Sequence, residues 1–131
     1  KVRLPGTGGG NDINSFPDIV VAMKHEKRRF VPKVDFVTSP GWLDGGTSRR
    51  DAGLPEGGPW RVVTDLGILG FDEVTREMTV LALHHGVTRE KVQESTGFEL
   101  RFAKTLETTA PPTKAEVELI RHLDPERRFI S

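Results

Sequence analysis

The sequence predicts a mixed α/β domain with more strand than helix. Short β-branched apolar runs bounded by turn residues point to strands, and residues 19–23 and 78–83 are the clearest of these. Two other segments carry helix-capping signals. The chain has 131 residues, 35% of them hydrophobic, which is enough to bury one core. We therefore expect a single domain over residues 1–131.

Extended structure is expected in the first part of the chain. Residues 19–23 (IVVAM) follow a proline and charge follows them, which is typical of a buried strand. Residues 34–38 alternate apolar and polar side chains before Ser-Pro-Gly, so they predict a second strand. Residues 41–59 are rich in glycine, proline and charge and predict a long functional or mobile loop. Trp42 and Trp60 flank this loop, where they shield a site or anchor packing.

A β-hairpin is the simplest arrangement for the next segment. Residues 60–64 and 66–71 are mostly apolar and extended, and residues 72–77 are polar. Residues 78–83 are again apolar, so the polar segment is expected to be the hairpin turn. Residues 100–103 predict one further short strand.

Two or three helices are expected. Thr88 can cap a helix that ends before Gly97. Thr113 and Glu116 have the spacing of a capping box, and an apolar stripe follows them as far as Asp124. A short helix after the glycine-rich N-terminal segment would be the third.

Charge and composition exclude several classes of function. The 19 lysines and arginines balance 19 aspartates and glutamates, so no overall field attracts nucleic acid or an anionic membrane, and we expect neither as a partner. The absence of cysteine excludes disulfides, thiolate metal ligands and a cysteine nucleophile. It is also compatible with the cytoplasmic location that we expect. No apolar run is long enough to cross a bilayer.

Two kinds of site have little support in the sequence. His84 and His85 are neighbours on a predicted strand and point to opposite faces, so they are not expected to share a metal ion. We therefore expect no metal site. Ser15, Ser39 and Ser48 do not have the surroundings of a nucleophile elbow, so a hydrolase triad is not indicated.

The glycine-rich segment at residues 6–12 is the first candidate site. Its glycines are Gly6, Gly8, Gly9 and Gly10. Without Cβ atoms, successive amides can turn toward a phosphate or a developing oxyanion. Asn11 and Asp12 can then cap a short helix. The alternative is a tight turn that brings two backbones together.

The charged segment at residues 24–30 is the second candidate. It follows a predicted strand directly, and α/β folds place ligands at the carboxyl ends of strands. An anion site is one interpretation of its lysines, arginines and histidine. A solvated, charged turn is the other.

Three stretches, taken in order, resemble a known family. Residues 6–13 are similar to its G-x-G-G-x-x-D loop, and residues 25–31 with 34–41 are similar to a segment of glutaconate-type subunits. Residues 86–98 resemble its helix and glycine stop. The family is the class I coenzyme A transferases, and the resemblance is to the C-terminal half of a B (β) subunit of the glutaconate CoA-transferase type. It implies an open α/β sheet of the NagB/RpiA/CoA-transferase-like type.

The resemblance implies ping-pong transfer of CoA between carboxylic acids through a glutamyl-CoA thioester. In the family the nucleophilic glutamate sits in an S-E-N-G-type motif before the glycine loop, and no such motif occurs here. The nucleophile is therefore expected outside this chain, which alone would be inactive. A glutamate-free hydrolase subunit of the same fold, which opens a cyclic CoA thioester with water, is the alternative. A non-catalytic α/β interaction domain is the alternative from another class.

Residue roles follow from the same resemblance. The backbone amides of Gly8, Gly9 and Gly10 would form part of the oxyanion pocket over the thioester carbonyl. The residues implied to bind CoA or shape its site are Gly6, Asn11, Asp12, Lys27 and Arg28, and the last two could instead contact a partner subunit. Acyl-CoA would be a substrate, with no bound cofactor.

The expected partners are an A (α) subunit and the N-terminal part of the B subunit, in a hetero-oligomer. Lys1 is not a methionine, and the glycine loop follows it almost at once. We therefore expect the chain to be the C-terminal part of a longer unit.

Overall fold

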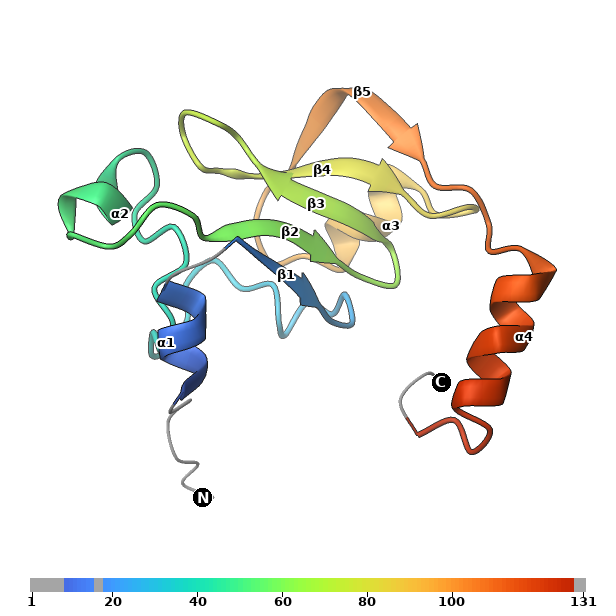
Figure 1. Cartoon of the computed structure of the whole chain (residues 1–131). Helices are drawn as coiled ribbons and strands as arrows, with labels where there is room; N and C mark the ends of the chain where they lie inside the picture. Colours follow the sequence, from blue (N-terminus) through green and yellow to red (C-terminus); the bar gives the residue numbers. More distant parts are fainter. Residues whose placement is uncertain (1–8, 16–17, 129–131) are drawn as a thin grey trace.

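One five-stranded sheet organises the chain in this computed structural model, which describes residues 9–15 and 18–128. The strands lie in chain order, as Figure 1 shows. They are β1 (Ile19–Ala22), β2 (Pro59–Val63), β3 (Gly67–Phe71), β4 (Met78–Leu83) and β5 (Arg101–Thr108). The pairs β1–β2 and β4–β5 are parallel, and the pairs β2–β3 and β3–β4 are antiparallel. The strands β1, β2, β4 and β5 therefore end at one edge, here called the carboxyl edge.

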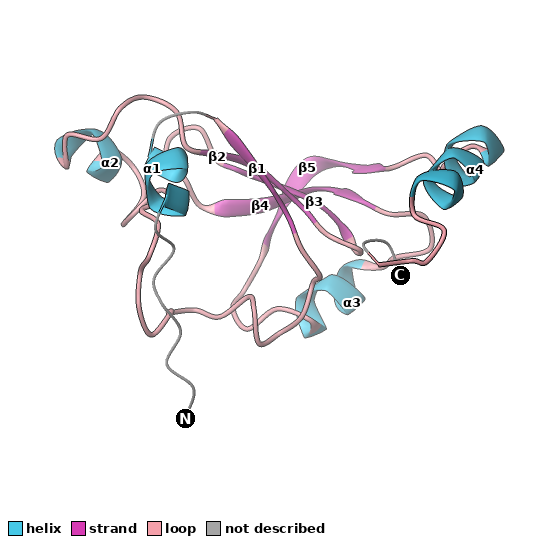
Figure 2. Cartoon of the chain, turned by 60° about the horizontal axis from the view of Figure 1, so that its bottom comes forward, coloured by secondary structure: helices cyan, strands magenta, loops and turns pink. Residues whose placement is uncertain are grey.

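Four helices accompany the sheet in the described residues: α1 (Gly9–Ser15), α2 (Ser48–Asp51), α3 (Arg89–Glu94) and α4 (Lys114–Leu123). Figure 2 shows α3 on one face of the sheet, α1 and α2 beyond one side and α4 beyond the other. Helix α2 is a single turn inside the expected loop at residues 41–59. The open mixed sheet with flanking helices confirms the α/β class.

The core lies between the sheet and helix α3. Leu69 of β3, Val80 of β4 and Val92 of α3 are the largest fully buried side chains. Phe30 and Leu100, from the connecting segments, complete the same cluster. Burial of such side chains contributes about 1.5–3 kcal/mol each, so this interface holds α3 to the sheet.

The predicted hairpin is confirmed, whereas the prediction of a strand at residues 34–38 is wrong. In the β3–β4 turn, Asp72 Oδ1 accepts hydrogen bonds from the backbone N–H groups of Val74 and Thr75 at 2.9 and 2.7 Å. Residues 34–38 form only bends, and Phe36 is 78% exposed. Alternation favours an extended chain, but a strand also needs a neighbour for its ladder, and the described part of the chain supplies none there.

Both helix caps are confirmed. Thr88 accepts from the N–H of Lys91, and Thr113 and Glu116 form the reciprocal capping box of α4. The glycine at position 97 is needed for a different reason from the helix stop that the sequence predicts. A Cβ on it would lie 2.6 Å from the carbonyl oxygen of Phe30, and the Gly97 N–H donates to that oxygen at 2.7 Å. The glycine therefore allows two backbones to meet.

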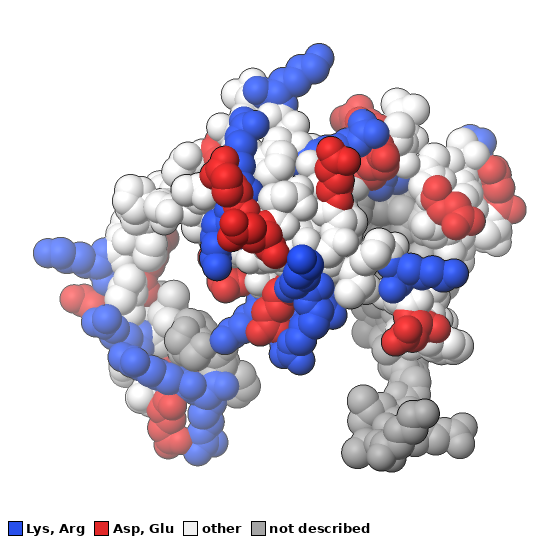
Figure 3. Space-filling model, turned by 180° about the vertical axis from the view of Figure 1, so that it is seen from behind, with Lys and Arg blue, Asp and Glu red and all other residues white. Residues whose placement is uncertain are grey.

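The outer surface of the molecule is mixed in charge and carries some apolar side chains. Basic and acidic side chains lie side by side over most of the face in Figure 3. The apolar stripe of α4 includes Leu119 and Leu123, which are both exposed. None of the helices in residues 9–15 and 18–128 is long and apolar enough to cross a membrane.

Candidate functional site

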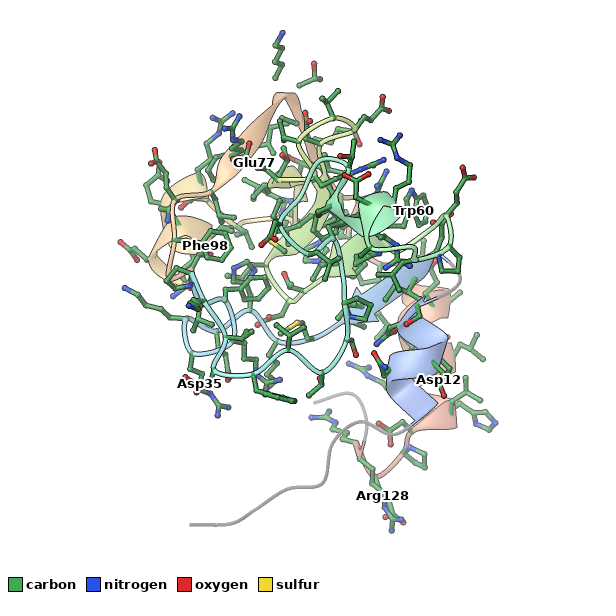
Figure 4. All side chains as sticks on the ribbon, turned by 90° about the vertical axis from the view of Figure 1, so that its left-hand side faces the viewer. Asp12, Asp35, Trp60, Glu77, Phe98 and Arg128 are labelled. Carbon is green, nitrogen blue, oxygen red and sulfur yellow. The ribbon has the colours of Figure 1, made fainter. Side chains whose placement is uncertain are left out.

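The glycine segment leads directly into helix α1. Gly6 and Gly8 lie outside the described residues. The described members, all in the first turn of the helix, are Gly9, Gly10, Asn11 and Asp12. Because the helix begins at Gly9, the two polar residues lie inside it and not at the cap position expected for them. Asp12 is exposed and points outward (Figure 4).

Helix α1 is held at its other end by Arg49 of helix α2. The Arg49 guanidinium is buried and donates from Nη2 to the carbonyl oxygen of Ser15 at 2.6 Å. It also donates to the carbonyl oxygens of Gly41 at 3.0 Å and Pro55 at 3.3 Å. A cation at the last carbonyls of a helix complements unpaired acceptors there. The segment at residues 41–59 thus positions the helix that follows the glycine segment.

The charged segment after β1 divides into buried and exposed parts. Glu26 accepts from Nε of Arg28 and Nε of Arg29, each at 2.8 Å. The hydrogen bonds from Arg29 and Arg28 hold the pKa of Glu26 below its usual range. Lys27 is exposed in the same turn. The candidate residues Lys27 and Arg28 therefore lie together on the surface, and Arg28 already has an acidic partner.

His25 belongs to the core and not to the exposed cationic group. Its ring stacks on Phe30 with centroids 4.0 Å apart. Thr96 Oγ1 donates to the carbonyl oxygen of Val92, so it accepts the Nε2 proton of His25 at 2.9 Å. Nδ1 lies 3.2 Å from Thr64 Oγ1, whose own proton is donated to the carbonyl oxygen of Gly67 at 3.1 Å. His25 is thus a structural crosslink beneath the carboxyl edge.

Acid should destabilise the protein through His25. Burial lowers the pKa of this ring below its ordinary value of 6.5, and the charge of Asp65 offsets part of that shift. The unfolded chain therefore binds a proton first as the pH falls, and the stabilisation present above pH 6.5 is lost below it. We expect the free energy of unfolding, measured with urea, to fall between about pH 7 and pH 5.

The variant His25→Gln tests this expectation. It should flatten the fall in the free energy of unfolding over that range, whatever its effect at neutral pH. His122→Gln is the matched control, because His122 is exposed on α4. The expectation fails if His25→Gln retains the full wild-type slope.

A second histidine also has a structural role at the carboxyl edge. His84 Nε2 donates to the carbonyl oxygen of Thr64 at 2.8 Å, and Nδ1 contacts Thr109 Oγ1 at 2.8 Å. These bonds join the ends of β2, β4 and β5. Within residues 9–15 and 18–128, no group of three histidine or carboxylate side chains could hold a metal ion.

One cavity lies near the edge of the sheet opposite to the carboxyl edge. It has a volume of about 920 Å³ and is bordered by the segment at residues 41–59, the start of β2 and the β3–β4 turn. Trp42 and Trp60, which flank that segment in the sequence, both line it, as does Arg49. The sequence pointed to the tryptophans, but it did not distinguish Arg49 from its exposed neighbour Arg50.

The fold, an open α/β sheet with a glycine segment leading into its first helix, is that of a CoA-transferase-type domain. The family model for coenzyme A transferase matches residues 1–95, and the chain therefore belongs to this family. This confirms the resemblance found in the sequence.

Individual relatives agree with the family. The chain is 47% identical over 132 aligned positions to the B subunit of glutaconate CoA-transferase from Acidaminococcus fermentans, covering 99% of this chain and 49% of that protein. It is 44% identical to the B subunit of 3-oxoadipate CoA-transferase from Pseudomonas knackmussii, covering 95% and 48%. It is also 34% identical to the cholesterol ring-cleaving hydrolase IpdB subunit of Rhodococcus jostii, covering 88% and 45%.

The fold has a solved counterpart in the crystal structure of glutaconate CoA-transferase from Acidaminococcus fermentans. The TM-score is 0.90 with 44% sequence identity, and the match covers all of this chain and 51% of that one. The chain thus spans about half the length of the curated relatives that it matches.

Proposed function

We propose that this chain is the C-terminal half of the B subunit of a CoA-transferase. The enzyme moves CoA between carboxylic acids, and its nucleophilic glutamate lies outside these 131 residues. The 47% identity to a glutaconate CoA-transferase B subunit over almost the whole chain carries this proposal. The completing partners are an A subunit and the N-terminal half of the B subunit, working in the cytoplasm.

The glycine segment has a defined role in the proposed reaction. The glutamate carboxylate attacks the acyl-CoA carbonyl, which forms an acyl–glutamyl anhydride and releases the CoA thiolate. The thiolate then attacks the glutamyl carbonyl, which gives a glutamyl-CoA thioester and the free acid. A second carboxylate reverses the two steps and leaves with CoA. Each attack develops an oxyanion, which the amides of Gly8, Gly9 and Gly10 stabilise.

Several other side chains complete the proposed site. Gly6, Asn11 and Asp12 hold the shape of the glycine segment where CoA approaches. Lys27 and Arg28, exposed in one turn after β1, contact either the CoA phosphates or the partner subunit. The two CoA-transferase relatives are named for glutaconate and 3-oxoadipate, both dicarboxylates, so glutaconyl-CoA and 3-oxoadipyl-CoA are the first substrates to test.

Trapping the covalent intermediate tests the proposal. The protein purified from its source, with co-purifying subunits, is incubated with each acyl-CoA and then treated with borohydride or hydroxylamine. We expect intact-mass and peptide analysis to find a modified glutamate on a co-purifying segment, and none when acyl-CoA is omitted. Binding of CoA without an adduct would instead favour the glutamate-free hydrolase, for which the 34% identity to the IpdB subunit is the supporting observation. Absence of any acyl-CoA binding would favour the interaction domain.

A further inference from the structure

Helix α1 has no buried side chain in the described part of the chain. Its one large apolar residue, Ile13, is 64% exposed. A helix of seven residues is too short to be stable by itself, so contacts to other elements must hold it. Among the residues that the structure describes, these contacts are polar, and they come from the chain between residues 39 and 49.

Two hydrogen bonds hold the last turn of α1. Asn14 Nδ2 donates to Ser39 Oγ at 3.0 Å, and both side chains are half-buried. Arg49 Nη2, from α2, donates to the carbonyl oxygen of Ser15 at 2.6 Å. Figure 2 shows the two helices beyond the same side of the sheet. A single contact would let the helix turn about it, whereas contacts on two adjacent residues restrict that rotation.

The segment that supplies these partners is itself fastened to the sheet. Trp42 Nε1 donates to the carbonyl oxygen of Pro59, the first residue of β2, at 2.8 Å. The Gly46 N–H donates to the carbonyl oxygen of Thr75 in the β3–β4 turn at 3.0 Å. A Cβ at Gly45 would lie 2.5 Å from the same oxygen, so the two turns lie directly against each other. The position of α1 is thereby fixed relative to the sheet.

Arg49 has the surroundings of a brace between backbone segments. Its guanidinium is 4% exposed, and it also donates to the carbonyl oxygens of Gly41 and Pro55. Burial of a cation is costly, and charge-assisted hydrogen bonds to three carbonyls offset that cost. Because the guanidinium is planar and rigid, it also fixes the directions in which these carbonyls lie.

We propose that Ser39 and Arg49 are positioning residues for CoA transfer, because they fix the helix that carries part of the glycine segment. The inference rests on the proposed function, in which amides of this segment stabilise the oxyanion. Gly9 and Gly10 lie in the first turn of α1, about 9 Å along the helix axis from its last turn. A helix transmits a displacement from one end to the other, and a misplacement of about 1 Å can cost about 100-fold in rate.

The hydrogen bond between Asn14 and Ser39 allows the mildest test, because its loss leaves no charge unpaired. In the assembled enzyme, Asn14→Ala and Ser39→Ala should each lower kcat about tenfold and leave the KM for acyl-CoA within about twofold of wild type. The double variant should lose no more than either single variant, since both remove the same bond. Ser39→Thr keeps the hydroxyl and should retain the wild-type kcat.

Arg49→Lys tests the second contact. It should lower kcat with little change in KM, because one ammonium group cannot reach all three carbonyls. Arg50→Lys is the matched control, since Arg50 is the exposed neighbour of Arg49 in the same helical turn. This control should leave both kcat and KM unchanged.

Kinetic constants distinguish a positioning role from a purely structural one. A lower midpoint of thermal unfolding with unchanged kcat in Asn14→Ala and Ser39→Ala would overturn the inference. A raised KM with unchanged kcat would also overturn it, because that result reports a loss of binding. Covalent trapping tests the transferase separately. A glutamate trapped in the wild type, together with wild-type kcat in these variants, would overturn only the positioning role, whereas no adduct in the wild type would remove the proposed function itself.

Discussion

Replacing Gly9 by alanine should lower the rate of CoA transfer about 100-fold while the protein folds normally. A Cβ at Gly9 would meet no other described atom within 4 Å, and alanine is the better helix former by about 1 kcal/mol. Among the described residues, no contact therefore requires a glycine at this position. In the proposed site the thioester oxygen approaches the bare backbone, and the Cβ of alanine would hold that oxygen away from the amide N–H. Loss of one such hydrogen bond costs about 10²–10³ in rate.

Two measurements on Gly9→Ala distinguish an effect on the active site from an effect on folding. The turnover number with acyl-CoA should fall, and the midpoint of thermal unfolding should stay the same or rise. Ser15→Ala, in the same helix, is the matched control, because the Ser15 hydroxyl donates, within residues 9–15 and 18–128, only to the carbonyl oxygen of Asn11 in its own helix. Wild-type turnover in Gly9→Ala would show that no substrate atom approaches this residue.

Arg49→Met should reduce the free energy of unfolding by about 3 kcal/mol. The variant removes three hydrogen bonds and leaves the carbonyl oxygens of Ser15, Gly41 and Pro55 without their donor. A buried acceptor left without a partner costs about 1–3 kcal/mol, and partial access of water reduces the sum. Arg49→Lys should recover only part of the loss, since one ammonium group cannot reach three diverging carbonyls as the guanidinium does.

The neighbouring arginine provides the matched control. Arg50 is exposed, and its only ion pair among the described residues is with Asp51 at 3.5 Å. Arg50→Met should therefore change the free energy of unfolding by less than about 0.5 kcal/mol. Urea unfolding measures both variants, and hydrogen exchange in α1 should rise for Arg49→Met alone. Equal stability losses in the two variants would contradict the anchoring role of Arg49.

Short-range patterns in the sequence correctly predicted much of the fold. The β3–β4 turn needs only Asp72 and its next three residues, and the α4 cap needs only Thr113 and Glu116. The same holds for the family, since the glycine segment and two other short stretches were enough to indicate coenzyme A transferases. Such features depend on residues that lie close together in the chain, so one sequence is enough to recognise them.

Tertiary contacts decided what local patterns could not. Apolar and polar side chains alternate in residues 34–38, as they do in a strand. These residues form no strand, because no neighbouring strand in the described part of the chain supplies hydrogen-bond partners. His25 looked like part of a cationic surface, and it is buried because Thr96, 71 residues away, pairs with its ring.

The sequence likewise could not distinguish between the two arginines of helix α2. Arg49 and Arg50 are equivalent in the sequence Ser-Arg-Arg-Asp, and only the first meets the carbonyl of Ser15, 34 positions earlier. By itself the sequence determined the class of fold, the helix caps, the hairpin and the family. The tertiary structure decided which charges are buried and where the cavity lies, because burial and pairing depend on residues that are distant in the chain and adjacent only after folding.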